Sequence, residues 1–322
     1  MRALAVPPRR VPVDRRGHMA HNQEQRNPTT EVTVDKVSAT TRSLRVEPDL
    51  EMFWYTWRPE GVARAGILVL HGFGEHAGRY DELGNYFAGK GFLVVAPDQR
   101  GHGRSSGQRG HVLRFDQYVD DLDAFVSHVR GQEPEVKDWF VLGHSLGGLI
   151  ALRYALRNQG QYRGLIVSNP LLGLSMKVPV LKALVGRVLS RVWPTLSMAN
   201  EINPDHLARD PSVGKAYMAD PLVHHRVTTR WFTEMNAALE DTHARAVGQL
   251  RLPALFLLST GDRLTDHTAS ERLFNRLTTP HKTLKVYDGW YHEIFNEADR
   301  QTVFADVVQW MEAQLVRGET AE

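Results

Sequence analysis

The sequence predicts an α/β protein whose mostly parallel central sheet is flanked by helices and interrupted by a helical insertion. Three observations predict this class. Short, uninterrupted apolar runs alternate with segments of helical spacing, as buried parallel strands and their crossover helices do. Between Asn169 and about Leu250 this alternation stops, and it resumes afterwards. A glycine-flanked serine, Ser145, directly follows one apolar run and opens a helical pattern.

The composition is that of an ordinary soluble protein with a sizeable core. The 322 residues are 42% hydrophobic and 24% charged, which suits one large domain with an inserted subdomain. Cysteine is absent, so disulfides, thiolate zinc sites and cysteine nucleophiles are excluded. No apolar run reaches the roughly 18 residues of a membrane span, and the N-terminus lacks the apolar core of a signal peptide. We therefore expect a cytoplasmic protein.

The positive charge of the chain is concentrated at its N-terminus. Residues 1–30 contain six arginines against Asp14 and Glu24, which gives +4, while the whole chain has +2. This head has no periodicity, and it predicts a disordered basic extension. Binding of nucleic acid by the head is the less favoured alternative, so we expect no nucleic-acid partner.

The first half of the predicted core alternates strands and helices. Residues 31–45 and Leu50–Trp57 alternate in the manner of an antiparallel pair at a sheet edge. Two continuous apolar runs follow, each typical of a strand buried on both faces and each followed by helical spacing. In chain order these are strand Gly66–Leu70, helix Arg79–Ala88, strand Phe92–Ala96 and helix Phe115–Val129.

The second half continues the alternation on both sides of the insertion, which predicts a doubly wound sheet. Residues 31–168 and 251–318 form the predicted core, and residues 169–250 form a helical cap. The expected elements are strand Phe140–Leu142, a helix from Leu146, strand Gly164–Ser168, strand Leu252–Leu258, strand Thr283–Val286 and helix Arg300–Leu315.

One amphipathic, basic helix is predicted in the insertion, over Val180–Trp193. Its apolar stripe comprises Leu181, Leu184, Val185, Val188, Leu189 and Val192, and the basic residues away from the stripe are Lys182, Arg187 and Arg191. Two interpretations stay open: the stripe packs onto the core, or part of it meets a membrane or micelle surface. The second predicts reversible peripheral adsorption without spanning.

The stretch Gly143-His144-Ser145-Leu146-Gly147 has the pattern of a nucleophile elbow. A serine at a sharp turn between strand and helix has strained backbone geometry, and we expect larger side chains in place of Gly143 or Gly147 to collide with the turn. The helix after the turn directs its free amides toward an oxyanion formed beside the serine. Ser145 is therefore the predicted nucleophile.

The base and its orienting carboxylate are expected on loops after late strands, in the order serine, aspartate, histidine. Asp262 follows the predicted strand ending at Leu258, and His292 follows the last strand, with the small Gly289 before it. Asp266 and Asp288 are competing carboxylates. We predict that Asp262 and His292 complete the triad.

An oxyanion hole needs two backbone amides, and the sequence offers them at Leu146, after the nucleophile, and at Phe73, in the loop after the first buried strand. Nothing in the sequence supports a cofactor or metal. Neither Gly72-x-Gly74 nor Gly101-x-Gly103 extends to a dinucleotide or P-loop motif, and no H-E-x-x-H pattern occurs.

From about Leu50 to Met311 the chain resembles the α/β-hydrolase superfamily, and within it the monoacylglycerol lipase and lysophospholipase branch. The motifs that carry the resemblance are His71-Gly72-Phe73-Gly74-Glu75-His76-Ala77-Gly78-Arg79-Tyr80, Asp98-Gln99-Arg100-Gly101-His102-Gly103-Arg104-Ser105, Arg109-Gly110-His111-Val112, Gly143 to Gly148, Asp262-Arg263-Leu264-Thr265-Asp266 and Tyr291-His292.

The resemblance implies the α/β-hydrolase fold with a cap, the triad and oxyanion hole named above, and Glu75, Arg79 and Tyr80 near the glycerol end of the substrate. Two departures concern the acyl pocket. Phe73 stands where some members of the branch have a small residue, and Leu146 stands where methionine is frequent.

We therefore expect a serine ester hydrolase that cleaves a monoacylglycerol-like lipid through an acyl-enzyme. Lysophospholipase, carboxylesterase, thioesterase and proline-type aminopeptidase would use the same triad. A peptidase would also need acidic cap residues to bind a free amino terminus, and Glu201, Asp205 and Asp210 are candidates. A noncatalytic ligand-binding member of the fold is disfavoured, because all three triad residues are present.

Overall fold

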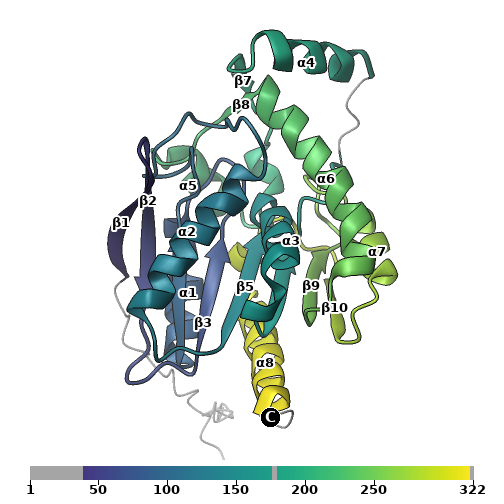
Figure 1. Ribbon diagram of the computed structural model, residues 1–322. Helices are drawn as coiled ribbons and strands as arrows, with labels where there is room; N and C mark the ends of the chain where they lie inside the picture. The colour runs from purple at the N-terminus through teal and green to yellow at the C-terminus, as the bar shows by residue number, and fades with distance from the viewer. Residues whose placement is uncertain (1–38, 176–179, 320–322) are drawn as a thin grey trace, which may run out of the picture. The chain divides into compact units, whose positions relative to one another are not determined.

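A computed structural model describes residues 39–175 and 180–319 of the chain. The predicted N-terminal extension, residues 1–30, and the start of the first predicted strand lie outside the described residues. Within them, the central feature is an eight-stranded sheet (Figure 1). Its strands are, in order across the sheet, β1 (Thr40–Glu47), β2 (Leu50–Trp57), β4 (Phe92–Pro97), β3 (Ala65–Leu70), β5 (Trp139–His144), β6 (Gly164–Ser168), β9 (Ala254–Ser259) and β10 (Lys282–Tyr287).

The directions of the strands agree with the sequence. β1 pairs with β2, and β2 with β4, in antiparallel fashion. The remaining pairs of the sheet, β4 with β3, β3 with β5, β5 with β6, β6 with β9 and β9 with β10, are all parallel. The buried runs become the parallel strands because both of their faces are covered. The predicted α/β class with a mostly parallel sheet is therefore confirmed.

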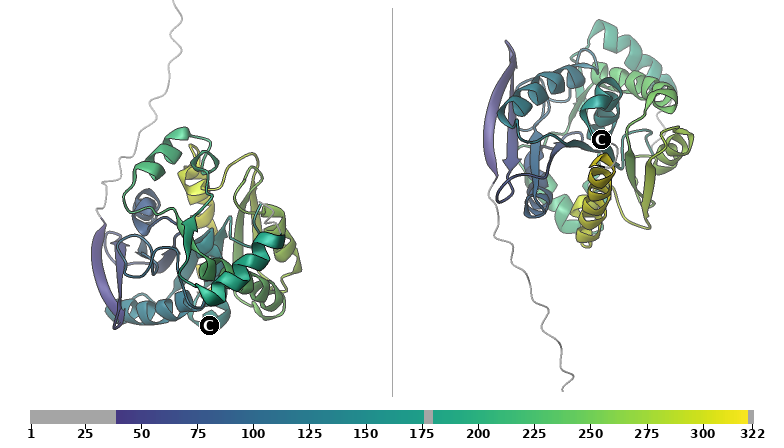
Figure 2. Two further views of the ribbon diagram at one scale, coloured as in Figure 1. Left: turned by 90° about the horizontal axis from the view of Figure 1, so that it is seen from above. Right: turned by 60° about the horizontal axis from the view of Figure 1, so that its bottom comes forward.

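Helices cover both faces of the sheet, and successive residues of the central strands belong to different cores. In β5, Val141 packs in the core formed with α2 (Gln117–Gln132) and α3 (Leu146–Asn158). Its neighbour Leu142 packs in the core formed with α1 (Asp81–Gly89) and α8 (Arg300–Glu319). Figures 1 and 2 show α8 and α3 on opposite sides of the sheet.

The helix predicted over Arg79–Ala88 is divided in the structure. A 3₁₀ turn, Ala77–Tyr80, precedes α1. The Asp98 carboxylate accepts a hydrogen bond from the Ala77 amide at 2.8 Å, and the His76 side chain accepts one from the Gly78 amide. These two side chains hold the segment as a tighter turn, which directs Arg79 and Tyr80 toward Glu75.

We call residues 169–250, between β6 and β9, the cap segment. The predicted amphipathic helix is present as α4 (Val180–Val192), which packs on α6 (Thr229–Gln249) (Figure 1). The segment predicted as a helical cap is not wholly helical, because β7 (Ser197–Ala199) and β8 (Arg226–Thr228) form a small antiparallel pair. Three residues are too few for an alternation to show in the sequence. α5 (Pro211–Ala219) and α6 were not predicted.

Candidate active site

Ser145 lies at the turn between β5 and α3, with φ 53° and ψ −117°. Only this residue and Asn169 among the described non-glycine residues have positive φ. A Cβ at Gly143 would lie 2.2 Å from the carbonyl oxygen of Gly147, and a Cβ at Gly147 would lie 2.0 Å from that of Leu70. The two glycines therefore allow β5, α3 and the end of β3 to approach one another closely. This packing holds Ser145 in its strained backbone conformation.

His292 and Asp262 lie side by side beside this turn. The His292 Nδ1 is 2.7 Å from the Asp262 Oδ2, which leaves Nε2 as the nitrogen available to a serine hydroxyl. The same carboxylate accepts hydrogen bonds from the Leu264 and Thr265 amides at 2.8 and 3.0 Å and from the Thr265 hydroxyl at 2.7 Å. Asp262 is therefore held as an acceptor that fixes the orientation of the imidazole.

The two groups stabilise each other's charged forms. Burial would raise the pKa of Asp262, but the His292 imidazole and the hydrogen bonds from His292 and Thr265 lower it below its usual value. Burial would lower the pKa of His292, but the carboxylates of Asp262, Glu293 and Glu75 raise it above its usual value. The site therefore favours an imidazolium formed when His292 takes up a proton.

The competing carboxylates have other partners. Asp266 is the N-cap of α7 (His267–Arg276), where it accepts hydrogen bonds from the Thr268 amide and hydroxyl. Asp288 accepts a hydrogen bond from the Thr260 hydroxyl at 2.7 Å. Of the three aspartates considered, the structure places Asp262 against His292.

A second histidine, His144, lies against His292, but its pKa is shifted in the opposite direction. The centroids of the two rings are 4.7 Å apart, and the His144 Nδ1 is 3.2 Å from the Ser168 hydroxyl. Burial lowers the pKa of His144 to about 3, and the charge of His292 acts in the same direction. His144 is therefore a neutral neighbour that packs the base in place.

The two predicted oxyanion residues come from different segments: Leu146 follows Ser145 in the chain, and Phe73 lines the same cavity as Ser145. Leu146 is the first residue of α3, so its amide has no acceptor within the helix. Phe73 lies in the loop after β3, and its ring contacts Trp231 on α6 at a centroid distance of 4.2 Å. The loop is also tied to the cap segment by a hydrogen bond of 2.8 Å from the His224 amide to the Gly74 carbonyl oxygen.

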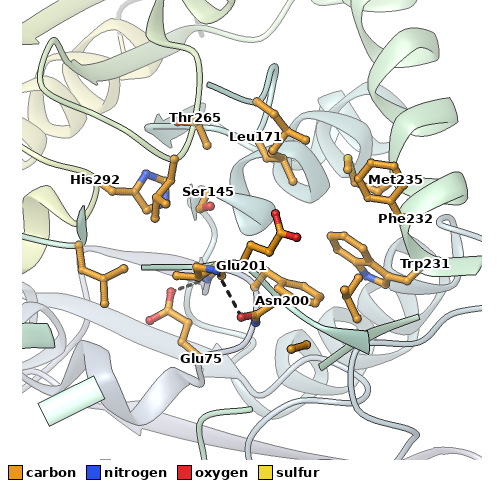
Figure 3. A pocket seen from close by; sticks show the side chains of 18 of the residues that line it. Glu75, Ser145, Leu171, Asn200, Glu201, Trp231, Phe232, Met235, Thr265 and His292 are labelled. Atoms are coloured by element: carbon orange, nitrogen blue, oxygen red, sulfur yellow. Dashed lines mark hydrogen bonds between the residues drawn. The ribbon is translucent and has the colours of Figure 1, made fainter. Parts of the chain in front are cut away.

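Glu75, Arg79 and Tyr80 form a hydrogen-bonded cluster, of which Figure 3 labels Glu75. The Glu75 carboxylate accepts from the Gly72 amide at 2.6 Å, the Tyr80 hydroxyl at 2.8 Å and Arg79 Nη1 at 2.6 Å. Of the three residues predicted near the glycerol end, Glu75 lines the cavity that also contains Ser145 and His292. Arg79 and Tyr80 lie behind it, around a much smaller pocket of about 10 Å³.

The sequence analysis missed one member of this cluster, Glu293. Its two carboxylate oxygens accept two hydrogen bonds of 2.7 Å from the Arg79 guanidinium, and it lines the same cavity as Ser145 and His292. Burial would raise the pKa of Glu293, but Arg79 lowers it to about 2. The only feature of the sequence that could have indicated a role for Glu293 is its position directly after His292, the predicted base.

Ser145 and His292 open into a cavity of about 320 Å³ between the core and the cap segment. In Figure 3, Trp231, Phe232 and Met235 of α6 lie across the cavity from His292, and Glu75 and Leu171 lie on opposite sides of Ser145. The apolar wall consists mainly of Leu171, Leu174, Met198, Ile202, Leu207, Val227, Trp231, Phe232, Met235 and Leu264. An ester bound at Ser145 would thus have an apolar space for one part and carboxylates near the other.

Of the acidic residues considered for binding an amino terminus, Glu201 lines the cavity. Asp210 instead caps α5, accepting a hydrogen bond from the Ser212 amide at 2.8 Å, and Asp205 is exposed in a 3₁₀ turn. Within residues 39–175 and 180–319, no group of three or more His, Cys, Asp or Glu residues is arranged to hold a metal ion.

The outer face of α4 is apolar and exposed. The exposed fraction is 58% for Leu184, 55% for Val188 and 78% for Val192, and the side chains of Arg187 and Arg191 are exposed as well. The interpretation in which the whole stripe packs onto the core is therefore wrong for these three residues. The same helix contributes Gly186 to the cavity lining. No helix in the described part of the chain is long and apolar enough to cross a membrane.

Comparisons with known proteins add a family match. The model of the family described as serine aminopeptidase, S33, matches residues 61–299. A monoacylglycerol lipase of Mycolicibacterium smegmatis is 34% identical over 259 residues, which cover 80% of this chain and 92% of the relative. Phospholipase YtpA of Bacillus subtilis is 32% identical, with 78% and 95% covered. The crystal structure of a Paleococcus ferrophilus monoacylglycerol lipase matches with a TM-score of 0.75 at 32% identity, over 82% of this chain and 99% of that one.

Proposed function

Because the chain belongs to the α/β-hydrolase family described as serine aminopeptidase, S33, we propose that it is a serine ester hydrolase that cleaves monoacylglycerols to fatty acid and glycerol. The observation that carries the proposal is the position of Ser145 and His292 in the cavity. They lie between an apolar wall, which suits an acyl chain, and the buried carboxylates of Glu75 and Glu293, which suit the hydroxyls of an alcohol.

The reaction follows from the geometry. The Ser145 hydroxyl attacks the ester carbonyl carbon while His292 Nε2 takes its proton, and the amides of Phe73 and Leu146 stabilise the oxyanion. The tetrahedral intermediate collapses to the acyl-enzyme, and His292 protonates the departing glycerol oxygen. Water activated by His292 then releases the fatty acid and regenerates Ser145. Asp262 keeps the imidazole in the required tautomer throughout. Acyl and proton transfer are the only chemistry needed, so the proposed reaction uses no cofactor.

The organisation of the chain is part of the proposal. Residues 31–168 and 251–318 would form the catalytic core, and residues 169–250 the cap that completes the cavity. The contribution of α6 to the apolar wall supports this division, because Trp231, Phe232 and Met235 face the serine from the cap segment.

We further propose that the exposed face of α4 adsorbs reversibly to micelles or to a membrane surface from the cytoplasm. An apolar face flanked by arginines is the pattern of an interfacial helix. The position of α4 supports the proposal, because a helix that lines the cavity from one side and exposes Leu184 and Val188 on the other lies between an aggregated lipid and the site.

The test is the replacement of Ser145 by alanine together with a hydrolysis panel. Ser145→Ala should abolish both turnover and labelling by a fluorophosphonate, while the protein keeps its melting temperature. The panel compares monoacylglycerols of several chain lengths, lysophosphatidylcholine, short p-nitrophenyl esters and aminoacyl anilides. Cleavage of the monoacylglycerols supports the proposal, and cleavage of the anilides alone would replace it by an aminopeptidase.

A further inference from the structure

Two buried carboxylates line the alcohol end of the cavity, and a guanidinium whose side chain is 10% exposed lies behind them. Glu75 is 4% exposed and Glu293 is 5% exposed. Both carboxylates line the cavity, whereas the Arg79 guanidinium that joins them does not. When both carboxylates are ionised, two negative charges and one positive charge leave the cluster with one net negative charge.

The positive charge of Arg79 is already fully engaged. Its Nη1 donates to Glu75 at 2.6 Å and to Glu293 at 2.7 Å, and its Nη2 donates to Glu293 at 2.7 Å. The guanidinium also lies over the Tyr217 ring, 5.0 Å from the centroid. If Glu75 takes up a proton, the cluster becomes neutral, and Arg79 is still paired with Glu293. In either state no positive charge is left to meet an anion.

The rest of the lining supplies no permanent positive charge, and His292 acts as the base only in its neutral form. The described residues that line the cavity include no lysine and no arginine. An anionic group that entered this end would lose its hydration and meet carboxylates, which carries a large free-energy penalty in a buried site. Ionised carboxylates accept hydrogen bonds and cannot donate them. The group that suits them is therefore a hydrogen-bond donor, such as the hydroxyls of a neutral alcohol.

We propose that the Glu75–Arg79–Glu293 cluster selects leaving groups that donate hydrogen bonds and carry no negative charge, and discriminates against esters whose alcohol bears a phosphate. This inference rests on the proposed function, in which the alcohol leaves from the Glu75 side of Ser145. It narrows the substrate class to esters of neutral alcohols such as glycerol.

The experiment compares glycerol monobutyrate with butyryl-glycerol 3-phosphate. Both dissolve as monomers, so adsorption through α4 does not affect the comparison. We expect kcat/KM to be lower for the phosphate by about a hundredfold or more, since like charges brought together at a desolvated site oppose binding by several kcal/mol. The ratio should persist in about 1 M salt, because buried charges are screened much less than exposed ones.

The variant Glu293→Gln tests whether the cluster causes the preference for the uncharged ester. The amide has nearly the same shape as the carboxylate but no charge. The variant therefore removes one of the two negative charges that surround the Arg79 guanidinium. We expect the ratio of the two kcat/KM values to fall by about tenfold or more. Any loss of turnover common to both substrates cancels in this ratio. Glu271→Gln, which removes an exposed carboxylate from α7, is the matched control and should leave the ratio unchanged.

The outcomes separate this inference from the proposed function. If glycerol monobutyrate is cleaved and the phosphate ester is cleaved within about threefold of it, or if the preference disappears in high salt, the selectivity is wrong and the esterase stands. An unchanged ratio in Glu293→Gln removes the cluster as its cause; if that variant does not fold, Glu75→Gln removes the same charge. Failure to cleave any glycerol ester, with cleavage of aminoacyl anilides, would overturn the proposed function instead.

Discussion

The two walls of the cavity are built in different ways. On the core side, the polar side chains have multiple hydrogen bonds: Asp262, the partner of His292, accepts four, and Glu75 accepts three. On the cap side, α4 contributes Gly186 to the cavity lining, while Leu184 on its outer face is 58% exposed. The core wall thus has the character of a fixed reaction site, and the cap wall that of a surface which still has a partner to meet.

Two helices of equal length show this difference directly. α3 and α4 each have 13 residues. In α3, Leu149 and Ile150 are fully buried, and the helix holds the elbow in position. In α4, Val188 is 55% exposed. Apolar residues at helical spacing are thus buried in α3 and exposed in α4. A substitution at the catalytic site should affect micellar and soluble substrates equally, whereas one on the exposed face of α4 should affect only micellar substrates.

The largest expected effect is the loss of activity caused by Asp262→Asn, on the core side of the site. The amide cannot hold the reactive tautomer of His292, and we expect kcat to fall on the order of 10⁴-fold. The loss should be the same for micellar and for soluble esters, as measured by initial rates. Asp288→Asn, at an exposed carboxylate on the neighbouring loop, is the control and should keep nearly full activity. A decrease of less than about tenfold in Asp262→Asn would mean that another group orients the base.

The next largest expected effect is a decrease in the free energy of unfolding when Arg79 is replaced. Arg79→Met leaves the buried Glu75 and Glu293 without their cation, and breaking a buried ion pair in this way lowers the free energy of unfolding by about 3 to 5 kcal/mol. Denaturant titration measures it. Arg245→Met, whose partner Asp241 is 45% exposed, is the matched control with an expected change below about 1 kcal/mol. Equal effects of the two substitutions would show that the cluster contributes no more than a surface pair.

The core wall was more predictable from sequence than the cap wall, for a physical reason. The buried strands, the elbow and the triad rest on local patterns, such as a five-residue motif or an apolar run that ends in a loop, which can be read without knowing the fold. The pairing of Arg79 with Glu293 joins residues 214 positions apart, so no local pattern contains it. Glu293 could be recognised as part of the site only when the fold brought them together.

The cap segment was less predictable because its elements depend on their neighbours. α6 mixes apolar and polar residues around Trp231 and Met235, since one part faces α3 and the core while another faces the cavity. For α4 the pattern predicted the helix, but the same stripe was compatible with burial and with exposure, and only the packing decided between them.

A third prediction is the pH dependence of the core wall. His292 must be neutral to accept the serine proton, and neighbouring carboxylates raise its pKa above 6.5. Therefore kcat/KM should rise with pH through an apparent pKa above 6.5 and fall about tenfold for each unit below it. In Glu293→Gln this acid limb should move to lower pH, because one of the raising charges is lost. An acid limb that stays in place in this variant would contradict the electrostatic coupling. Substitutions on α4 should leave the limb unchanged.

The smallest effect is expected on the cap wall, from Leu184→Ser combined with Val188→Ser. Both side chains are more than half exposed, at 58% and 55%, so the melting temperature should stay within about 2 °C. Activity on a soluble short-chain ester should also be kept. Removal of two inserting side chains should lower binding to anionic vesicles and the rate on micellar long-chain monoacylglycerol by about tenfold.

The control for this last variant removes as much exposed apolar surface from elsewhere. Val62 and Val316 are 83% and 61% exposed and lie outside the cap segment, so Val62→Ser combined with Val316→Ser should leave vesicle binding unchanged. A loss confined to micelles in the α4 variant then identifies α4 as the adsorbing surface. An equal loss on micelles and on the soluble ester, with a lower melting temperature, would instead show that Leu184 and Val188 support the fold, and the two walls would no longer differ in the way proposed.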